Sequence, residues 1–305
     1  MKPVLTICCT TFNQEKYIEQ TLEGFYLQKT NFPIEIQIHD DASTDGTQAI
    51  LKKHAEKDPR IKLILQTENK YSQHIMPWWH YSFPQAEGKY IALCEGDDYW
   101  TDPLKIQKQV DFLEANSGYV ISWTNYQIFN GSSFSSNAWN HQTENTTIDY
   151  NNIFSPYCTL TLTAVFKKEA LDLALLKSFK YSKDNSLYLV LLQKGKGVFM
   201  DFEAAVYRVH QGGVYSLQSE FFKNYSSYLN VKEVTDAIPE SKTANLKKVV
   251  KSLGNATAFE VLKLKNAGQD LSEIQLNFMK SYFLEADFKT KFKYYKRLLK
   301  YRLSK

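Results

Sequence analysis

Three carboxylate side chains stand within four consecutive residues of this 305-residue chain, at Glu95, Asp97 and Asp98. Carboxylates so close together repel one another, and a divalent cation relieves that repulsion. Magnesium and manganese prefer oxygen ligands, typically one or two carboxylates together with substrate phosphates and water. The cluster therefore predicts a metal site that receives a phosphorylated substrate. The alternative is that the acidic cluster is only a turn, which leads into a helix that has Asp102 as its N-cap and Pro103 as its first residue.

A second acidic pair, Asp40 and Asp41, also follows directly on an apolar segment. Isoleucines at every second position predict a strand over residues 34–39, and residues 90–94 form the apolar run before the first cluster. Ligands of parallel α/β sheets bind at the carboxyl ends of the strands. We therefore expect the two acidic groups to line one cleft.

The elements that would position these groups alternate along the chain. Further strands are expected at residues 4–10, 61–65, 119–128, 159–166 and 199–208. Helices are expected at 15–28, after a cap at Ser43, after Asp102, and at 186–193, 243–265, 272–287 and 288–303. Residues 131–145 have the composition of a loop. The alternation indicates an α/β fold with a mostly parallel sheet flanked by helices and a C-terminal helical extension.

The charge distribution separates the two ends of the chain. The net charge is +4, but residues 217–305 hold 17 Lys and Arg against 9 Asp and Glu. We therefore expect one domain over residues 1–216, followed by a basic helical region over 217–305. A basic region favours anionic surfaces, but it carries no recognisable nucleic-acid-binding motif, so we expect no nucleic-acid partner.

Cysteine usage and the N-terminus indicate the compartment. The four cysteines form no CxxC pair, which argues against a zinc or redox motif and fits buried thiols in a reducing cytosol. The sequence shows neither a signal-peptide pattern nor a run of 18 apolar residues. We therefore expect a cytoplasmic protein, peripheral on the inner face of the cell membrane if the basic helices bind lipid.

Three segments resemble one enzyme family when taken in order: TTFNQEKYIEQTL at 10–22, DDASTDGT at 40–47 and EGKYIALCEGDDYWTDPLKIQKQ at 87–109. They are similar to the family 2 glycosyltransferases of the GT-A fold, and the resemblance extends from Pro3 to Ser216. It implies an inverting transferase that moves a sugar from a nucleoside diphosphate to a hydroxyl of a glycan or lipid-linked acceptor. The expected nucleotide is UDP, with GDP and dTDP as alternatives. Such enzymes often build bacterial surface polysaccharide, lipopolysaccharide or capsule.

The resemblance also assigns roles to residues of this chain. Donor-binding roles fall on Thr10, Thr11, Phe12, Asn13, Asp40, Asp41 and Glu95. Asp97 becomes the principal ligand of Mn²⁺ or Mg²⁺, with Asp98 as a ligand or its partner. Glu95 departs from the family, which usually has aspartate at that position.

The resemblance places a catalytic base at Asp184, at the head of a helix, where it would take the proton of the acceptor hydroxyl. The alternative is that Asp184 only caps that helix. The closing segment AVYRVHQGGVYS, at 205–216, suggests His210 as a further metal ligand and Arg208 as a contact to the diphosphate. Gly212 and Gly213 suggest a loop that orders over the donor.

Two aromatic features remain open between function and packing. Trp100 either stacks on the acceptor sugar or belongs to the core. Residues 288–305 hold eight Lys and Arg and no acid, with Phe292, Tyr295 and Leu299 near one helical stripe. This segment is either an interfacial helix on anionic lipid or a helix packed on the catalytic domain.

Two other functions are weaker alternatives. A sugar-nucleotide pyrophosphorylase needs a glycine-rich loop after the first strand, and residues 11–14 contain no glycine. A non-catalytic scaffold at the membrane that kept the fold would not need Asp97, Asp98, Asp184 and His210 together.

Overall fold

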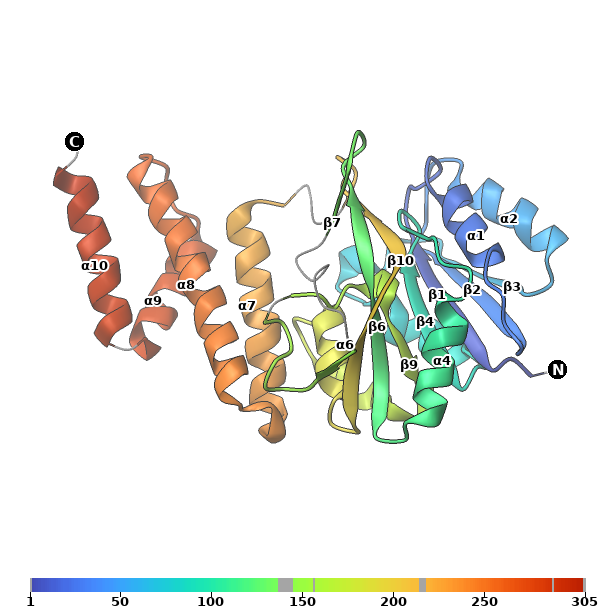
Figure 1. The fold of residues 1–305 in the computed structure, drawn as a ribbon. Coiled ribbons are helices and arrows are strands. Elements are labelled where there is room, and N and C mark those ends of the chain that lie inside the picture. Colours follow the sequence, from blue (N-terminus) through green and yellow to red (C-terminus); the bar gives the residue numbers. More distant parts are fainter. Residues whose placement is uncertain (1, 137–144, 156, 214–217, 287, 304–305) are drawn as a thin grey trace.

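The computed structural model describes residues 2–136, 145–155, 157–213, 218–286 and 288–303 (Figure 1). The strands are β1 (Leu5–Thr11), β2 (Ile34–Asp40), β3 (Ile61–Leu65), β4 (Tyr90–Glu95), β5 (Tyr99–Trp100), β6 (Tyr119–Phe129), β7 (Phe134–Ser136), β8 (Thr146–Ile148), β9 (Val165–Lys167) and β10 (Lys196–Arg208). The helices are α1 (Ile18–Tyr26), α2 (Thr47–Lys57), α3 (Phe83–Gln85), α4 (Lys105–Ala115), α5 (Leu173–Ser178), α6 (Asp184–Leu191), α7 (Glu220–Ala237), α8 (Ala244–Asn266), α9 (Glu273–Glu285) and α10 (Phe288–Leu303). Short helical turns lie at Tyr71–Gln73, Trp78–Ser82 and Thr161–Thr163.

One mixed sheet forms the centre of the molecule, in the order β3-β2-β1-β4-β9-β6-β10-β5. Strands β3, β2, β1 and β4 are parallel, as are β6 and β10, whereas β9 runs antiparallel to both β4 and β6. The expected α/β fold with a mostly parallel sheet flanked by helices is confirmed, with β9 joining its two parallel parts.

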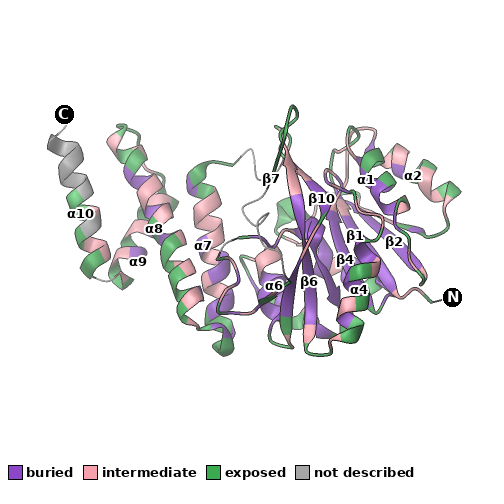
Figure 2. Ribbon diagram, viewed as in Figure 1, coloured by how far each residue is buried: buried purple, intermediate pink, exposed green. Residues whose placement is uncertain are grey.

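The sheet separates two hydrophobic cores because side chains alternate along each strand. Ile7 and Cys9 of β1 face a core that includes α1, α2 and α4. Cys8 faces the other core, which includes the Trp78–Ser82 turn, α6 and α7. Figure 2 shows the resulting buried strands between the exposed outer faces of the helices.

The C-terminal helices extend away from the sheet in the order α7, α8, α9 and α10 (Figure 1). Helix α7 places Val231 and Val234 in the same core as the sheet, and Ile238, directly after the helix, joins them. Its other side, at Phe221 and Tyr228, joins a third, small core formed with α8 and α9. The basic region thus begins within the packing of the sheet, and the predicted boundary at 216/217 lies outside the described residues.

Several local predictions were wrong. Helix α7 was not predicted, because its apolar residues serve two cores and so follow no single stripe. The predicted strand at 159–166 is a 3₁₀ turn, Thr161–Thr163, followed by the short β9. Helix α2 begins at Thr47 rather than after Ser43, since the Ser43 hydroxyl donates to Asp40 while Asp45 accepts from the Thr47 amide. In the predicted loop, β7 forms at Phe134–Ser136, and residues 137–144 lie outside the described part of the chain.

Candidate active site

Strand register brings the predicted donor-site residues to one edge. Thr10 pairs with Glu95 across β1 and β4, and Thr11 pairs with Asp40 across β1 and β2. The carboxyl ends of three parallel strands therefore meet at this edge. The backbone therefore places both acidic groups at one edge of the sheet, and that they line one cleft stays a prediction.

The turn after β4 is fastened on two sides. The Gly96 amide donates to the Thr10 carbonyl at 2.9 Å. The Thr21 hydroxyl of α1 donates to the carbonyls of Gly96 at 2.9 Å and Asp98 at 2.6 Å. A side chain at Gly96 would collide with Gln14 Oε1 and Thr11 Oγ1. The close approach of the first loop therefore requires glycine between the acidic residues.

Asp98 points into the protein. It is 2% exposed, and its Oδ1 accepts from the Arg208 amide at 2.7 Å. The Arg208 guanidinium donates to the Asp97 carbonyl and to Gln20 Oε1, and it lies 4.3 Å from the Tyr99 ring centroid. The predictions of a metal-ligand role for Asp98 and a diphosphate contact for Arg208 do not fit these contacts. Both residues instead fasten β10 to the acidic turn.

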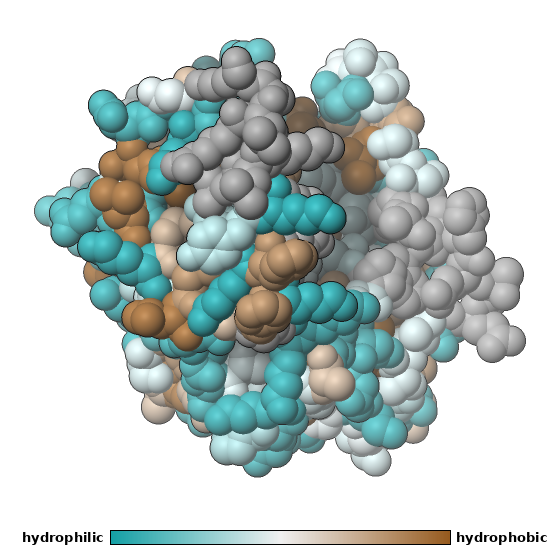
Figure 3. Space-filling model, turned by 90° about the vertical axis from the view of Figure 1, so that its left-hand side faces the viewer, coloured by the Kyte–Doolittle hydropathy of each residue, from teal (hydrophilic) through white to brown (hydrophobic). Residues whose placement is uncertain are grey.

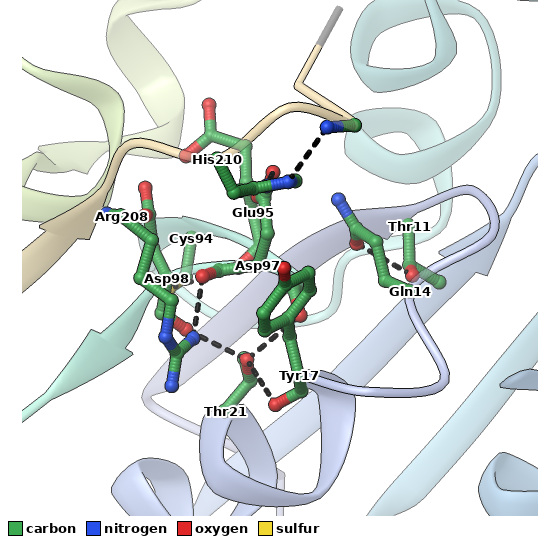
Figure 4. Close-up of polar contacts among 12 residues, drawn as sticks. Thr11, Gln14, Tyr17, Thr21, Cys94, Glu95, Asp97, Asp98, Arg208 and His210 are labelled. Carbon is green, nitrogen blue, oxygen red and sulfur yellow. Dashed lines mark hydrogen bonds and ion pairs between the residues drawn. The ribbon is translucent and has the colours of Figure 1, made fainter. Parts of the chain in front are cut away.

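Asp97 and His210 form the one predicted metal-binding pair whose side chains meet. His210 Nε2 lies 3.0 Å from Asp97 Oδ2, and the side chains are 16% and 19% exposed. The Gly212 amide donates to His210 Nδ1 at 3.1 Å, so a neutral ring carries its proton on Nε2. The imidazole lies 4.6 Å from the Tyr17 ring, between centroids. Figure 4 shows Asp97, Asp98, Arg208 and His210 grouped around Tyr17.

The donor set fits a divalent cation that takes further ligands from a substrate. Over the described residues, no three His, Cys, Asp or Glu side chains are grouped to hold an ion by themselves. Asp97 and His210 would supply two ligands, and phosphate oxygens and water complete such sites in proteins. Glu95 Oε2 is buried without a hydrogen-bond partner in the described structure. Burial and then the Asp97 charge raise the pKa of both Glu95 and Asp98, and the Arg208 charge opposes this increase at Asp98.

Asp40 and Asp41 are both buried and bind protein groups. Asp40 accepts from the Ser43 amide at 2.9 Å and from Gln48 Nε2 at 2.6 Å. Asp41 accepts from the amides of Lys70 and Tyr71, at 2.8 and 2.9 Å. Their carboxylates thus shape the loops beside the strand ends.

The loop after β1 is tied to the loop after β2. Asn13, at φ +53°, accepts from the Thr44 amide at 2.7 Å through Oδ1. Thr11 is buried and donates to Gln14 Oε1, whereas Phe12 is 38% exposed. Of the predicted donor-site residues in this loop, Phe12 and Asn13 are exposed and therefore open to a ligand.

Asp184 is the first residue of α6, and Lys183 occupies the cap position. The structure thus does not support the alternative that Asp184 is the cap of this helix. Asp184 Oδ1 accepts from the Asn185 amide at 2.9 Å, and Tyr157 Oη lies 3.4 Å from Oδ2. Burial raises the pKa of Asp184. Its charge contributes to raising the pKa of Glu95, so the two acids lie within electrostatic reach.

The predicted acceptor contact of Trp100 is wrong for this structure. The side chain is 1% exposed, and its indole N–H donates to the Leu162 carbonyl at 2.8 Å. Lys105 lies 4.3 Å over its ring. Trp100 therefore belongs to the core beneath the acidic turn.

Tyr157 was missed by the sequence analysis. Its hydroxyl contacts both Asp184 Oδ2 and Asn185 Oδ1, at 3.4 and 3.3 Å, and the residue is 44% exposed. It lies 27 residues before Asp184 in a segment without a recognised motif. Only the fold brings the two residues together.

Comparison with known proteins gives a consistent result. A family model described as glycosyl transferase family 2 matches residues 6–173. The Escherichia coli protein WfaP, a UDP-Glc:alpha-D-GlcNAc-diphosphoundecaprenol beta-1,3-glucosyltransferase, is 32% identical over 216 residues, covering 69% of this chain and 79% of that protein. Three uncharacterised mycobacterial proteins are 43% identical over 110 residues, and this match spans 36% of the chain and 31% of their length.

Two solved structures share the fold. S. aureus TarS 1–349 in complex with UDP-GlcNAc superposes with a TM-score of 0.64 at 17% identity, covering 95% of this chain and 83% of that chain. The mannosyltransferase PcManGT from Pyrobaculum calidifontis, in complex with GDP-Man and Mn²⁺, gives a TM-score of 0.59 at 15% identity with the same coverage. At these identities the likeness establishes the GT-A-like fold.

Proposed function

We propose that this chain, which belongs to glycosyl transferase family 2, transfers a sugar from a UDP-linked donor to a hydroxyl of a glycan or lipid-linked acceptor. The family is inverting, and the chain is a glycosyltransferase that uses a nucleotide-sugar donor. The product would enter a bacterial surface polysaccharide. The observation that carries the proposal is the pairing of Asp97 with His210 beside the buried carboxylates of Glu95 and Asp98.

Asp97 and His210 would hold Mn²⁺ or Mg²⁺, which supplies positive charge to the diphosphate as it leaves. Asp184 takes the proton of the acceptor hydroxyl. The acceptor oxygen forms a bond to the anomeric carbon while the bond from that carbon to the diphosphate oxygen breaks. Attack on the face opposite the leaving group inverts the configuration. The raised pKa of Asp184 strengthens it as a base once it is ionised.

Names of similar proteins support the choice of substrates. WfaP uses UDP-Glc and a diphosphoundecaprenol-linked acceptor, as its name states. TarS was solved with UDP-GlcNAc, and PcManGT with GDP-Man and Mn²⁺. We extend to this chain the UDP-linked donor, the divalent cation and the lipid-linked or glycan acceptor. Thr10, Thr11, Phe12 and Asn13 remain proposed donor contacts, and Asp40, Asp41 and Glu95 are proposed to line the same pocket.

The C-terminal helices carry the proposed membrane contact. No helix in the described part of the chain is long and apolar enough to cross a bilayer. Leu284 and Phe288 are each 83% exposed, and Phe292 and Tyr295 are 59% and 61% exposed. Figure 3 shows hydrophobic patches among hydrophilic side chains at this end of the molecule. Exposed apolar side chains within a basic helix fit peripheral binding to anionic lipid, which would bring the enzyme to a lipid-linked acceptor.

Calorimetry with a panel of UDP, GDP and dTDP tests the donor site. We expect UDP to bind with Mn²⁺ and not with a chelator, and Asp97→Ala to abolish the binding. Asp111→Ala, on the exposed side of α4, is the matched control. Absence of nucleotide binding under every condition would refute the transferase mechanism and favour the non-catalytic scaffold at the membrane.

A further inference from the structure

Helix α7 contacts the loop that leads into the proposed catalytic base. This loop joins α5 to α6 and ends at Asp184, the first residue of α6. Glu233 of α7 accepts from two consecutive amides of the loop, Lys180 N to Oε1 at 2.9 Å and Tyr181 N to Oε2 at 2.8 Å. Both carboxylate oxygens are thus used on the loop backbone. Charge-assisted hydrogen bonds of this kind are stronger than neutral ones.

Two further residues of α7 contact the same loop. Asn230 is fully buried, and its Nδ2 donates to the Tyr181 carbonyl at 2.7 Å and to Ser186 Oγ at 2.5 Å. Ser226 Oγ accepts from Lys183 Nζ at 2.7 Å. The amide of Asn230 thereby joins the loop before Asp184 to the first turn of the helix after it.

The three residues lie on one face of α7. Positions 226, 230 and 233 are spaced by four and three residues, which places them in line on a helix. We call Ser226, Asn230 and Glu233 the α7 stripe. Asn230 Oδ1 is buried and has no partner in the described structure. An unpartnered buried acceptor is destabilising, so packing alone does not explain an amide at this position.

The side chain of Asp184 has few constraints of its own. Its contact with Tyr157 is long, at 3.4 Å, and it also accepts a hydrogen bond from the amide of its neighbour Asn185. The direction of the carboxylate therefore depends on the backbone on either side of it. That backbone is held by the α7 stripe.

We propose that the α7 stripe is a positioning device for the catalytic base, holding residues 180–186 so that Asp184 faces the acceptor hydroxyl. The inference rests on the proposed function, since it takes Asp184 as the base. It makes the start of the C-terminal region part of the catalytic machinery. Ser226, Asn230 and Glu233 are positioning residues, because they act through Asp184.

A double-mutant cycle tests this role. We expect Asn230→Ala and Glu233→Ala each to lower kcat for hydrolysis of UDP-glucose or UDP-GlcNAc by about 10- to 100-fold, since small misplacements of a reacting group have effects of this size. The Kd for UDP with Mn²⁺ should stay within about twofold. In an Asp184→Asn background, the same substitutions should leave the residual kcat nearly unchanged. Glu233→Gln, which keeps one acceptor oxygen, should recover part of the loss.

Lys232→Ala is the matched control on the same helix. It removes the Lys232–Asp236 ion pair, at 2.9 Å on the side of α7 away from the stripe, and should retain kcat. Hydrogen exchange of the amides at 180–186 gives a readout independent of turnover. Exchange should accelerate in Asn230→Ala and Glu233→Ala but not in Lys232→Ala.

The outcomes separate the inference from the proposed function. An unchanged kcat in both stripe variants, or an equal loss with and without Asp184, would overturn the positioning role while leaving the transferase intact. Full activity of Asp184→Asn would overturn the base assignment and the inference with it. If the wild type shows no turnover, the proposed function fails. In that case, unchanged amide hydrogen exchange at residues 180–186 in the stripe variants would also overturn the claim that the α7 stripe holds this loop.

Discussion

Asp97 Oδ2 and His210 Nε2 lie 3.0 Å apart although the residues are separated by 113 positions in the chain. The turn after β4 supplies one and the segment after β10 supplies the other. Arg208 joins the two segments through its own amide and guanidinium. If Nε2 binds a cation, the ring proton must move to Nδ1, which then cannot accept from the Gly212 amide. Metal binding and the conformation at Gly212 are therefore linked.

Replacing His210 tests whether the pair binds metal. We expect His210→Ala to weaken Mn²⁺-dependent UDP binding by roughly 10- to 100-fold, the range reported when a partner of a metal site is lost. Binding in the presence of a chelator should not change. Calorimetry at several Mn²⁺ concentrations measures this. The control is His54→Ala, which removes from α2 an imidazole that is hydrogen-bonded to the Tyr26 hydroxyl of α1. An equal effect in this variant would refute a specific role for His210.

Replacing the proposed base tests the chemical step. Asp184→Asn keeps the size of the side chain but cannot accept the acceptor's proton at neutral pH. We expect kcat to fall by ~10²–10⁴-fold, with the Kd for UDP unchanged. Asp172→Asn is a suitable comparison, since Asp172 caps α5 by accepting from the Leu175 amide and asparagine caps equally well. A fall in UDP affinity that accounts for the whole effect would place Asp184 in the donor site instead.

The sequence predicts the strand ends well and the distant contacts poorly. Asp40 ends β2 and Asp97 follows the end of β4 by two residues, so local pattern and the rule for parallel sheets place them at one edge. The inward direction of Asp98 depends on an amide 110 residues away, which no local pattern encodes. The sequence leaves Trp100 open between an acceptor contact and the core, because its burial involves the Leu162 carbonyl, 62 residues away.

Helix α7 illustrates a different limit. Its residues divide between two cores and the α7 stripe, so the periodicity that reveals a one-sided helix is absent. The capping box of α9, in contrast, is local, and the predicted pair Ser272 and Gln275 forms it. Prediction succeeds where the determining contacts lie within a few residues.

Tyr157→Phe tests the contact between Tyr157 and the proposed base. The Tyr157 hydroxyl donates to the Asp184 carboxylate and thereby favours its charged form, which opposes the increase in pKa caused by burial. Without the hydroxyl, the pKa of Asp184 should rise. The acidic limb of the kcat–pH profile should therefore move to higher pH. The control is Tyr119→Phe, which removes a hydroxyl that hydrogen-bonds Thr147 away from the site and should leave the profile unchanged. A shift of the acidic limb to lower pH in Tyr157→Phe would contradict the assignment.

The proposed lipid contact is tested with the full chain and vesicles. Phe288→Ser combined with Phe292→Ser removes two exposed aromatic side chains from α10. Binding to phosphatidylglycerol vesicles should weaken about tenfold or more, because each buried aromatic contributes roughly 1.5–3 kcal/mol. Sedimentation measures it. Phe134→Ser, at the exposed tip of β7, is the control, and equal wild-type binding to phosphatidylcholine and phosphatidylglycerol would rule out the role of charge.

Lys105 links stability to pH. The side chain is fully buried beside Trp100 and donates to Gln109 Oε1 at 2.9 Å. Burial lowers its pKa from 10.5 to about 7. Between these two values the unfolded chain holds the proton that the folded chain has released. Stability therefore rises with pH through this window, by about 1.4 kcal/mol per pH unit at most, and below it the penalty for the buried charge is constant.

Lys105→Met removes this titration. Measured by thermal unfolding, the wild type should gain Tm relative to Lys105→Met as the pH rises from 7 to 9. The difference between the two proteins should be constant below about pH 6, where Lys105 is protonated in both states. Lys108→Met removes an exposed ammonium that pairs with Asp102 and should track the wild type over the same range. If Lys105→Met also tracks the wild type from pH 7 to 9, Lys105 keeps its proton in the folded protein, and the cation–π contact with Trp100 outweighs burial.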